Sequence, residues 1–160
     1  MSRRRYWLLK SEPGSFSFED LWAAKGRRTP WDGVRNYQAR NLLRDELRPG
    51  DGVLFYHSNA DPTGVAGLAE VASEPRPDPT QFDPADDHFD PQARPEDPRW
   101  WLVDVRAVQR LPRTVPLAEL KAEPGLAAMA VCQRGSRLSV QPVTPAEWRL
   151  VQRLAGSKPK

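Results

Sequence analysis

The 160-residue sequence has a single cysteine, Cys132, and only two histidines, His57 and His88. One cysteine excludes an internal disulfide and fits a reducing compartment. With only Arg134 beside it, Cys132 is interpreted as a small buried hydrophobic residue rather than a nucleophile. No spacing of cysteine and histidine resembles a zinc site, and we expect no bound metal.

Long apolar runs are also missing. No stretch approaches the length that spans a membrane, and Met1–Arg5 precedes a strand-like segment rather than the apolar core of a signal peptide. We therefore expect no membrane partner. The expected location is the cytoplasm, as in the bacterial cytosol, or the nucleus of a eukaryote.

The common nucleotide and nucleophile motifs are absent too. There is no Gly-x-Ser-x-Gly, no P-loop and no dinucleotide fingerprint, so no cofactor is expected. The acidic residues around His88 could hold calcium, but they lack the regular ligand positions and the glycine of a calcium loop. A solvated acidic loop is the better interpretation of that segment.

Charge is unevenly distributed rather than in large excess. The formal net charge is +3 and the sequence pI is near 9.3, which permits binding to a polyanion without requiring it. Basic residues crowd the first half of the chain: Arg3, Arg4, Arg5, Lys10, Lys25, Arg27, Arg28, Arg35, Arg40, Arg44 and Arg48. Acidic residues crowd one later segment: Asp83, Asp86, Asp87, Asp90, Glu96 and Asp97. The first half is therefore the part suited to phosphate.

Strand-like and helix-like segments follow one another without a repeated βαβ unit. Strands are expected at Tyr6–Ser11, Gly52–Ser58, Gly64–Ser73, Trp100–Leu111 and Arg137–Val143. Helices are expected after a capping box at Ser17, from Tyr37 to about Leu47 behind the N-cap Asn36, at Leu117–Lys121, at Gly125–Met129 and after a capping box at Thr144. This pattern predicts a small α+β barrel in a single domain over residues 1–156, followed by a polar tail over 157–160.

One segment, Pro75–Pro98, is too rich in proline for regular structure. We expect a long loop there, which is uncommon unless it is functional. Before it, Gly64 and Gly67 suggest a bulge or a close backbone approach within a strand.

The segment Trp31–Arg44 gives the clearest indication of function in the sequence. Trp31 lies on an Asp-Gly turn and leads into a helix with arginines on its solvent side. A flat apolar face beside cations suits a nucleobase with its phosphate. A lone tryptophan is more often part of the core, but the polar neighbours of Trp31 favour a stacking surface. The arginines could equally be the solvent-exposed face of an ordinary helix.

A second candidate site is the segment Tyr56–Ser58. It ends a strand before a polar loop, which predicts a barrel mouth where small ligands bind.

Ordered blocks along nearly the whole chain resemble the EVE domain family: Tyr6–Pro13, Trp31–Asn41, Gly50–Asn59, Gly67–Val71, Asp78–Thr80 and Arg134–Val143. The resemblance implies a PUA-like fold, which is a curved, mostly antiparallel β-barrel flanked by short helices. It also implies kinship with the YTH domains that read N6-methyladenosine in RNA.

The function implied by this resemblance is non-enzymatic binding of DNA or RNA, with a modified nucleobase held at the barrel mouth. In YTH domains a Lys-Ser pair at the end of the first strand and a later tryptophan help to form the base pocket, and Lys10-Ser11 and Trp31 occupy corresponding places. The residues expected in the base pocket are Lys10, Ser11, Trp31, Asn36, Tyr37, Tyr56, His57 and Ser58. Those expected to meet phosphates are Arg35, Arg40 and Arg44.

Two alternatives remain open. ASCH-type relatives hydrolyse acetylated cytidine with a lysine and a glutamate, which implies a hydrolase acting on a modified nucleoside, with Lys10 and either Glu12 or Glu70 in those roles. A protein-interaction adaptor would instead use the acidic loop Asp83–Asp97. No particular protein partner is indicated.

Overall fold

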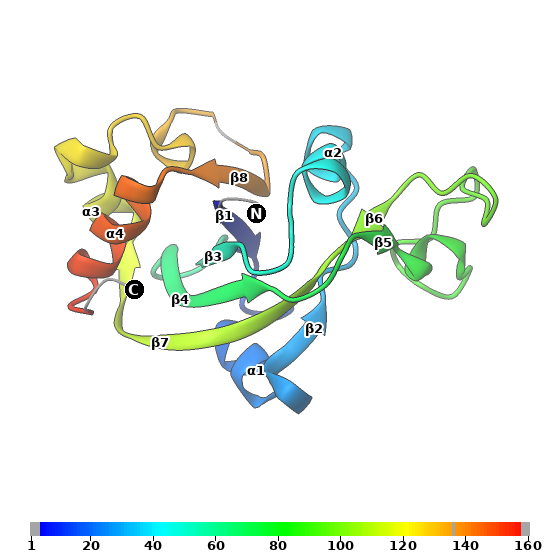
Figure 1. Ribbon diagram of the computed structural model, residues 1–160, viewed down its shortest axis with the longest axis horizontal. Helices are drawn as coiled ribbons and strands as arrows, with labels where there is room; N and C mark the ends of the chain where they lie inside the picture. Colours follow the sequence, from blue (N-terminus) through cyan, green and yellow to red (C-terminus); the bar gives the residue numbers. More distant parts are fainter. Residues whose placement is uncertain (1–3, 136, 158–160) are drawn as a thin grey trace.

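A computed structural model describes residues 4–135 and 137–157, so the predicted polar tail lies outside the described residues except for Ser157. A mixed six-stranded sheet curls through the molecule into half a barrel, in the order β2-β7-β4-β3-β1-β8 (Figure 1). Its strands are β1 Tyr6–Ser11, β2 Arg28–Pro30, β3 Gly52–His57, β4 Gly64–Val71, β7 Asp104–Pro116 and β8 Val140–Val143. Strand β1 runs parallel to β3, and the other neighbouring pairs are antiparallel. The predicted curved, mostly antiparallel sheet is therefore confirmed.

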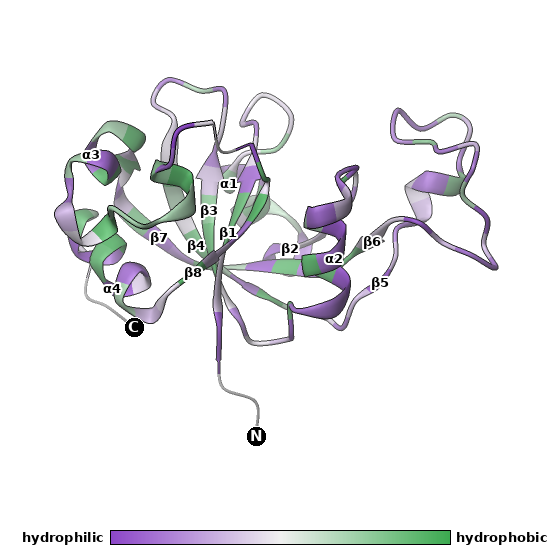
Figure 2. Cartoon of the chain, turned by 90° about the horizontal axis from the view of Figure 1, so that it is seen from above, coloured by the Kyte–Doolittle hydropathy of each residue, from purple (hydrophilic) through white to green (hydrophobic). Residues whose placement is uncertain are grey.

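The proline-rich segment projects from one end of this sheet (Figures 1 and 2). A two-stranded ribbon of β5 (Arg76–Pro77) and β6 (Trp101–Leu102) joins its two ends. The predicted strand Trp100–Leu111 is thus divided between β6 and the longer β7. The predicted strand Arg137–Val143 shortens to β8, because pairing with β1 begins at Val140.

In the described part of the chain, four α-helices flank the sheet: α1 Phe18–Ala23, α2 Tyr37–Asp45, α3 Leu117–Ala122 and α4 Pro145–Leu154. Short 3₁₀ helices lie at Lys25–Arg27, Pro79–Phe82, Pro124–Leu126 and Ala130–Cys132. The predicted caps are all present: Ser17 and Thr144 form capping boxes, and the Asn36 side chain accepts from the amide of Ala39. Helix α2 ends at Asp45, before the predicted Leu47.

The sheet separates two hydrophobic cores, because successive side chains of a strand point to opposite faces. On β1, Trp7 and Leu9 belong to the core under α1 and α2, whereas Leu8 belongs to the core under α3 and α4. On β3, Phe55 and Tyr56 are divided in the same way. Helices α3 and α4 lie at the opposite end of the molecule from the proline-rich segment (Figures 1 and 2).

Gly67 lets α1 seat against the sheet. A Cβ atom at Gly67 would lie 2.3 Å from the ring of Phe18, so no side chain fits between them. The Phe18 ring in turn meets the ring of Phe55 edge-on, with centroids 5.5 Å apart. The close backbone approach predicted at this glycine is confirmed.

Candidate functional site

A hollow of about 500 Å³ opens beside the C-terminal end of β1. Strand β2, the loop Trp31–Arg35, the turn after β1, Ser139 and one residue of the proline-rich segment form the rest of its wall. The lining residues are Lys10, Ser11, Ser15, Phe16, Thr29, Pro30, Trp31, Asp32, Gly33, Val34, Arg35, His88 and Ser139. This size is within the range of small-ligand pockets in proteins.

Trp31 belongs to both the hollow and the core. It is only 8% exposed, and its ring meets the ring of Phe55 edge-on, with centroids 5.4 Å apart. Its amide donates to the carbonyl of Val103 at 2.9 Å. The tryptophan is therefore held rigidly in the wall of the hollow, rather than standing free on a turn.

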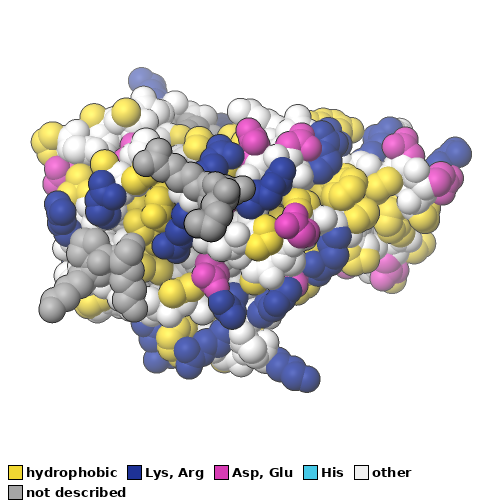
Figure 3. Space-filling model, in the orientation of Figure 1, with side chains coloured by type: hydrophobic (Ala, Val, Ile, Leu, Met, Phe, Trp, Pro, Cys, Tyr) yellow, Lys and Arg dark blue, Asp and Glu magenta, His cyan; other side chains and the backbone are white. Residues whose placement is uncertain are grey.

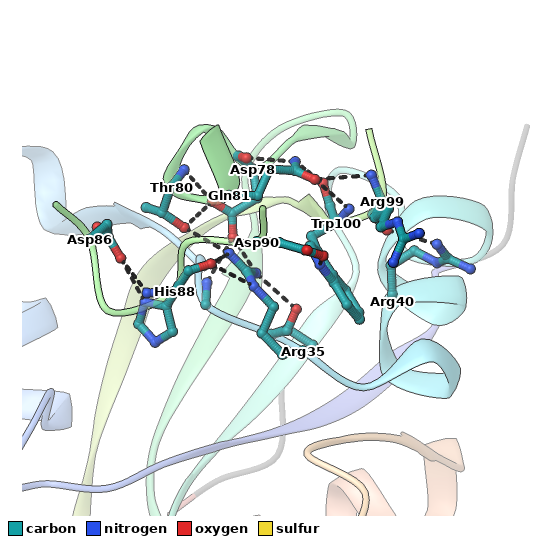
Figure 4. A network of polar contacts seen from close by, with 12 residues as sticks. Arg35, Arg40, Asp78, Thr80, Gln81, Asp86, His88, Asp90, Arg99 and Trp100 are labelled. Carbon is teal, nitrogen blue, oxygen red and sulfur yellow. Dashed lines mark hydrogen bonds and ion pairs between the residues drawn. The ribbon is translucent and has the colours of Figure 1, made fainter. Parts of the chain in front are cut away.

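A buried carboxylate, Asp78, fixes the loop that follows Trp31 (Figure 4). It accepts from the amide of Gly33 at 2.8 Å, from the guanidinium of Arg35 at 3.1 Å, and from both the amide and the hydroxyl of Thr80. Burial opposes ionisation of this carboxyl, but the hydrogen bonds outweigh it, and the pKa of Asp78 lies below its ordinary value. Gly33 has a φ of 79°, a conformation that glycine adopts without strain.

Arg35 ties the proline-rich segment to the rim of the hollow. Its guanidinium donates to the carbonyls of Val34 and His88, to the Asp78 carboxylate and to the Thr80 hydroxyl, so all three of its nitrogens have protein acceptors (Figure 4). The imidazole of His88 lies against Gly33, where a Cβ atom would be 2.7 Å from its Nε2. The segment proposed as an adaptor surface thus contributes part of the pocket wall.

Lys10 and Ser11 reach the hollow from the end of β1. Burial lowers the pKa of Lys10, and its ammonium lies 5.9 Å from the ring centre of Tyr56. The Ser11 hydroxyl donates to the carbonyl of Phe16 at 2.5 Å. The structure therefore brings four predicted site residues to one hollow: Lys10, Ser11, Trp31 and Arg35.

The predicted barrel mouth at Tyr56–Ser58 lies elsewhere. Tyr56 is 2% exposed in the core under α3 and α4, on the other face of the sheet from Phe55, and burial raises its pKa to about 12. The Nε2 atom of His57 accepts from the amide of Phe18 at 3.0 Å. The amide of Ser58 donates to the carbonyl of Ser11. None of the three lines the hollow.

A fall in pH from about 7 to about 5 is expected to destabilise the protein through His57. Burial lowers the pKa of His57 below its ordinary 6.5, and the contact with the Phe18 amide requires the neutral ring. The unfolded chain therefore takes up a proton first, and stability is lost as the pH falls from about 6.5 toward the folded-state pKa. Urea unfolding of the wild type and His57→Gln at each pH measures this. The variant should lack this pH-dependent component, whereas the matched variant His88→Gln should keep it.

The remaining predicted residues form a separate surface along α2. Asn36 caps the helix, and Tyr37, which is 51% exposed, stacks on the ring of Trp100 with centroids 4.8 Å apart. Arg40 lies over the Tyr37 ring at 4.8 Å and donates to the carbonyl of Arg99. Arg44 pairs with Asp45. These four predicted residues, Asn36, Tyr37, Arg40 and Arg44, do not line the hollow.

The glutamates considered for a hydrolase do not join Lys10. Glu70 pairs with Arg106 and lies opposite Gly52, at the far end of β3 from the residue that pairs with Lys10. Glu12 does not line the hollow. Among the described residues, no group of three or more His, Cys, Asp or Glu side chains could hold a metal ion. In the same residues no helix is long and apolar enough to cross a membrane.

Sequence reasoning missed the parts of the site that depend on long-range contacts. No local sequence pattern indicates a base-binding role for Asp32, Asp78 or His88, although Asp78–Thr80 is one of the blocks that resemble the family. Gln81 was missed as well. Its buried amide donates to the carbonyls of Asp78 and Trp100 and accepts from the amides of Arg99 and Trp100, which fastens the two ends of the proline-rich segment together.

Comparison with known proteins gives consistent matches. Residues 5–154 match the family model described as EVE domain. Human thymocyte nuclear protein 1 is 42% identical over 170 residues, which cover 96% of this chain and 75% of that protein. The crystal structure of human THYN1 in complex with 5-methylcytosine-containing DNA has a TM-score of 0.89 and 41% identity, covering 97% of this chain and 99% of that one. The YTH domain of Zygosaccharomyces rouxii MRB1, in complex with N6-methyladenosine RNA, has a TM-score of 0.55 and 19% identity over 98% of this chain and 90% of that one, which shows a shared fold.

Proposed function

Since the chain belongs to the EVE domain family, we propose that it binds nucleic acid carrying a modified base and holds that base in the hollow beside Trp31. The base is turned out of its stack to reach the hollow, as in other proteins that inspect single bases. This activity involves binding and no chemical step.

The observation that carries this proposal is the composition of the hollow. A rigid tryptophan forms part of a wall that also contains the ammonium-bearing Lys10 and the carboxylate-bearing Asp32, together with serine and threonine residues. An aromatic face with a few polar groups is the combination that recognises an unstacked base. A relative that is 41% identical over 97% of this chain was crystallised with 5-methylcytosine-containing DNA, which supports the same class of ligand.

We assign the surrounding residues to three tasks. Trp31 supplies the stacking face, which is worth about 1–3 kcal/mol per base. Ser11 faces the edge of the base from the end of β1, while Lys10 lines the hollow with its ammonium over the ring of Tyr56. Arg40 and Arg44, on the exposed side of α2, meet the phosphates of the flanking strand, and Tyr37 lies beside them. Arg35 holds the rim, because all three nitrogens of its guanidinium have protein acceptors, whereas Arg40 and Arg44 each donate from only two of theirs.

The charge of the protein provides only a modest, non-specific attraction to nucleic acid. Lysine and arginine side chains are spread over the face shown in Figure 3, with acidic side chains between them. The net charge of +3 is small for a protein that binds by charge alone. Discrimination between nucleic acids therefore depends on the hollow, since phosphate contacts carry no sequence information.

A panel of matched oligonucleotides tests the proposal. DNA and RNA strands of one sequence, carrying either a normal or a methylated cytosine or adenine at one position, are titrated against the protein by fluorescence anisotropy. We expect at least one methylated strand to bind about tenfold more tightly than its unmodified counterpart. Ser15→Trp, which fills the hollow with a ring, should remove this preference.

Ala128→Trp is the matched control, because it adds the same ring at an exposed residue outside the hollow. It should bind like the wild type. Equal affinity for modified and unmodified strands across the whole panel would overturn the proposal. So would a preference that survives in Ser15→Trp, since the base would then be bound somewhere else.

A further inference from the structure

Asp32 differs from the other charged residues of the hollow in having no hydrogen-bond partner. Within the ranges 4–135 and 137–157, no hydrogen bond or ion pair involves its carboxylate. By contrast, Arg35 is fully engaged with protein acceptors, and the Ser11 hydroxyl donates to a carbonyl. The Asp32 carboxylate is thus an unused acceptor in the lining.

The backbone on both sides of Asp32 is fixed. The amide of Trp31 donates to the carbonyl of Val103 at 2.9 Å, and the amide of Gly33 donates to Asp78 at 2.8 Å. Asp32 therefore lines the hollow from a fixed backbone, directly after the stacking tryptophan. An acceptor on a fixed backbone can contact a bound base without a large rearrangement of the loop.

A carboxylate in the hollow favours particular ligands. Asp32 is an exposed residue, and partial burial of its carboxyl at the hollow raises its pKa, with a further contribution from the nearby carboxylate of Asp78, so the charged form is less stable there than in open water. A ligand N–H supplies a hydrogen bond to this charge, whereas a phosphate or a carbonyl oxygen is repelled. The part of a nucleic acid that fits here is therefore a donor on a base rather than the backbone.

We propose that Asp32 makes the hollow selective for bases with an exocyclic amino group, by accepting a hydrogen bond from that group. The inference rests on the proposed function and names the substrate class of the same hollow. Cytosine and adenine carry such an amino donor, while thymine and uracil present a carbonyl oxygen at the equivalent position. A 5-methylcytosine and a thymine have nearly the same shape and differ at this group and at the adjacent ring nitrogen N3, which carries a hydrogen only in thymine.

The test compares two DNA strands that are identical except for 5-methylcytosine or thymine at one position. One well-placed hydrogen-bonding pair gives about tenfold to hundredfold discrimination between bases, so the wild type should prefer 5-methylcytosine by that factor. Asp32→Asn replaces a pure acceptor with a group that can also donate to the thymine oxygen, and it should bring the ratio to about 1 or reverse it. Asp32→Ala should remove the preference without reversing it.

Asp87→Asn is the matched control, since it makes the same change of charge at an exposed residue that does not line the hollow. It should keep the wild-type ratio. Thermal unfolding should show both Asp32 variants folded, because no described contact depends on this carboxylate.

The possible failures are distinguishable. If the wild type binds the thymine strand as tightly as the 5-methylcytosine strand, or if Asp32→Asn keeps the full preference, the proposed role of Asp32 is wrong. Either result is still compatible with base binding in the hollow. A wild type that binds no modified strand in the panel overturns the proposed function, and the selectivity falls with it.

Discussion

Replacing Trp31 with alanine is expected to lower the free energy of unfolding by about 3–5 kcal/mol and to weaken binding of the modified strand about tenfold to hundredfold. The loss of stability follows from burial, because the ring is 8% exposed and packs edge-on against Phe55. The loss of binding follows from the missing stacking face. Urea unfolding and anisotropy titration at a temperature where the variant is folded measure the two effects separately.

Two further variants separate the roles of this ring. Trp31→Phe keeps an aromatic group against Phe55 and should recover most of the stability, with part of the affinity. Trp22→Ala removes a half-buried tryptophan that lies between the guanidinium groups of Arg27 and Arg110, outside the hollow. It should leave the affinity of the folded protein unchanged. If folded Trp31→Ala binds like the wild type, the stacking role of Trp31 is wrong.

Asp78→Ala is expected to have a comparable effect on stability, about 3–5 kcal/mol, and to loosen the rim of the hollow. The substitution deprives Arg35 of its ion-pair partner and leaves the amides of Gly33 and Thr80 without their acceptor. An unpaired donor costs about 1–3 kcal/mol when it is fully buried, and less at half-buried residues such as Gly33 and Thr80. Hydrogen exchange should rise in residues 31–35 and 78–90, while urea unfolding gives the change in stability.

The pH dependence gives a second measure of the same carboxylate. The pKa of Asp78 is depressed in the folded protein, so its contribution is complete above the ordinary aspartate value of about 3.9 and is lost as the pH falls through the folded-state pKa. Asp78→Ala should not show this pH-dependent loss of stability. Asp87→Ala, at an exposed residue of the same segment, should match the wild type in both measurements. If hydrogen exchange in residues 31–35 and 78–90 is the same in Asp78→Ala as in the wild type, Asp78 does not anchor these segments.

The sequence predicted those elements whose signals are local. The capping boxes at Ser17 and Thr144 and the N-cap at Asn36 each depend on residues three positions apart, and the structure has all of them. Strand β1 was predicted with its bounds because its apolar residues form one short run. Strand β2 was missed, since its three residues carry no strand pattern of their own and pair only through β7.

The site was less predictable because it joins distant segments. Arg35 binds Asp78 and the carbonyl of His88 across 43 and 53 positions of sequence, and no local pattern marks such pairs. The place of Tyr56 could have been predicted, however. Alternation along β3 puts Tyr56 on the face opposite Phe55, and Phe55 is the residue that contacts Trp31. Strand alternation therefore already placed Tyr56 and Trp31 on different faces of the sheet.

The two-sided sheet has a consequence for how this protein can change. Every residue that lines the hollow lies outside α3, α4 and β8, and the core under α3 and α4 shares no lining residue with the hollow. Substitutions there that leave Tyr56 and its contact with Lys10 in place, such as repacking around Trp148, are free to adjust the stability of the folded state without altering which ligand is chosen. Ligand preference and the stability of the fold can thus evolve, or be engineered, on opposite sides of a single sheet.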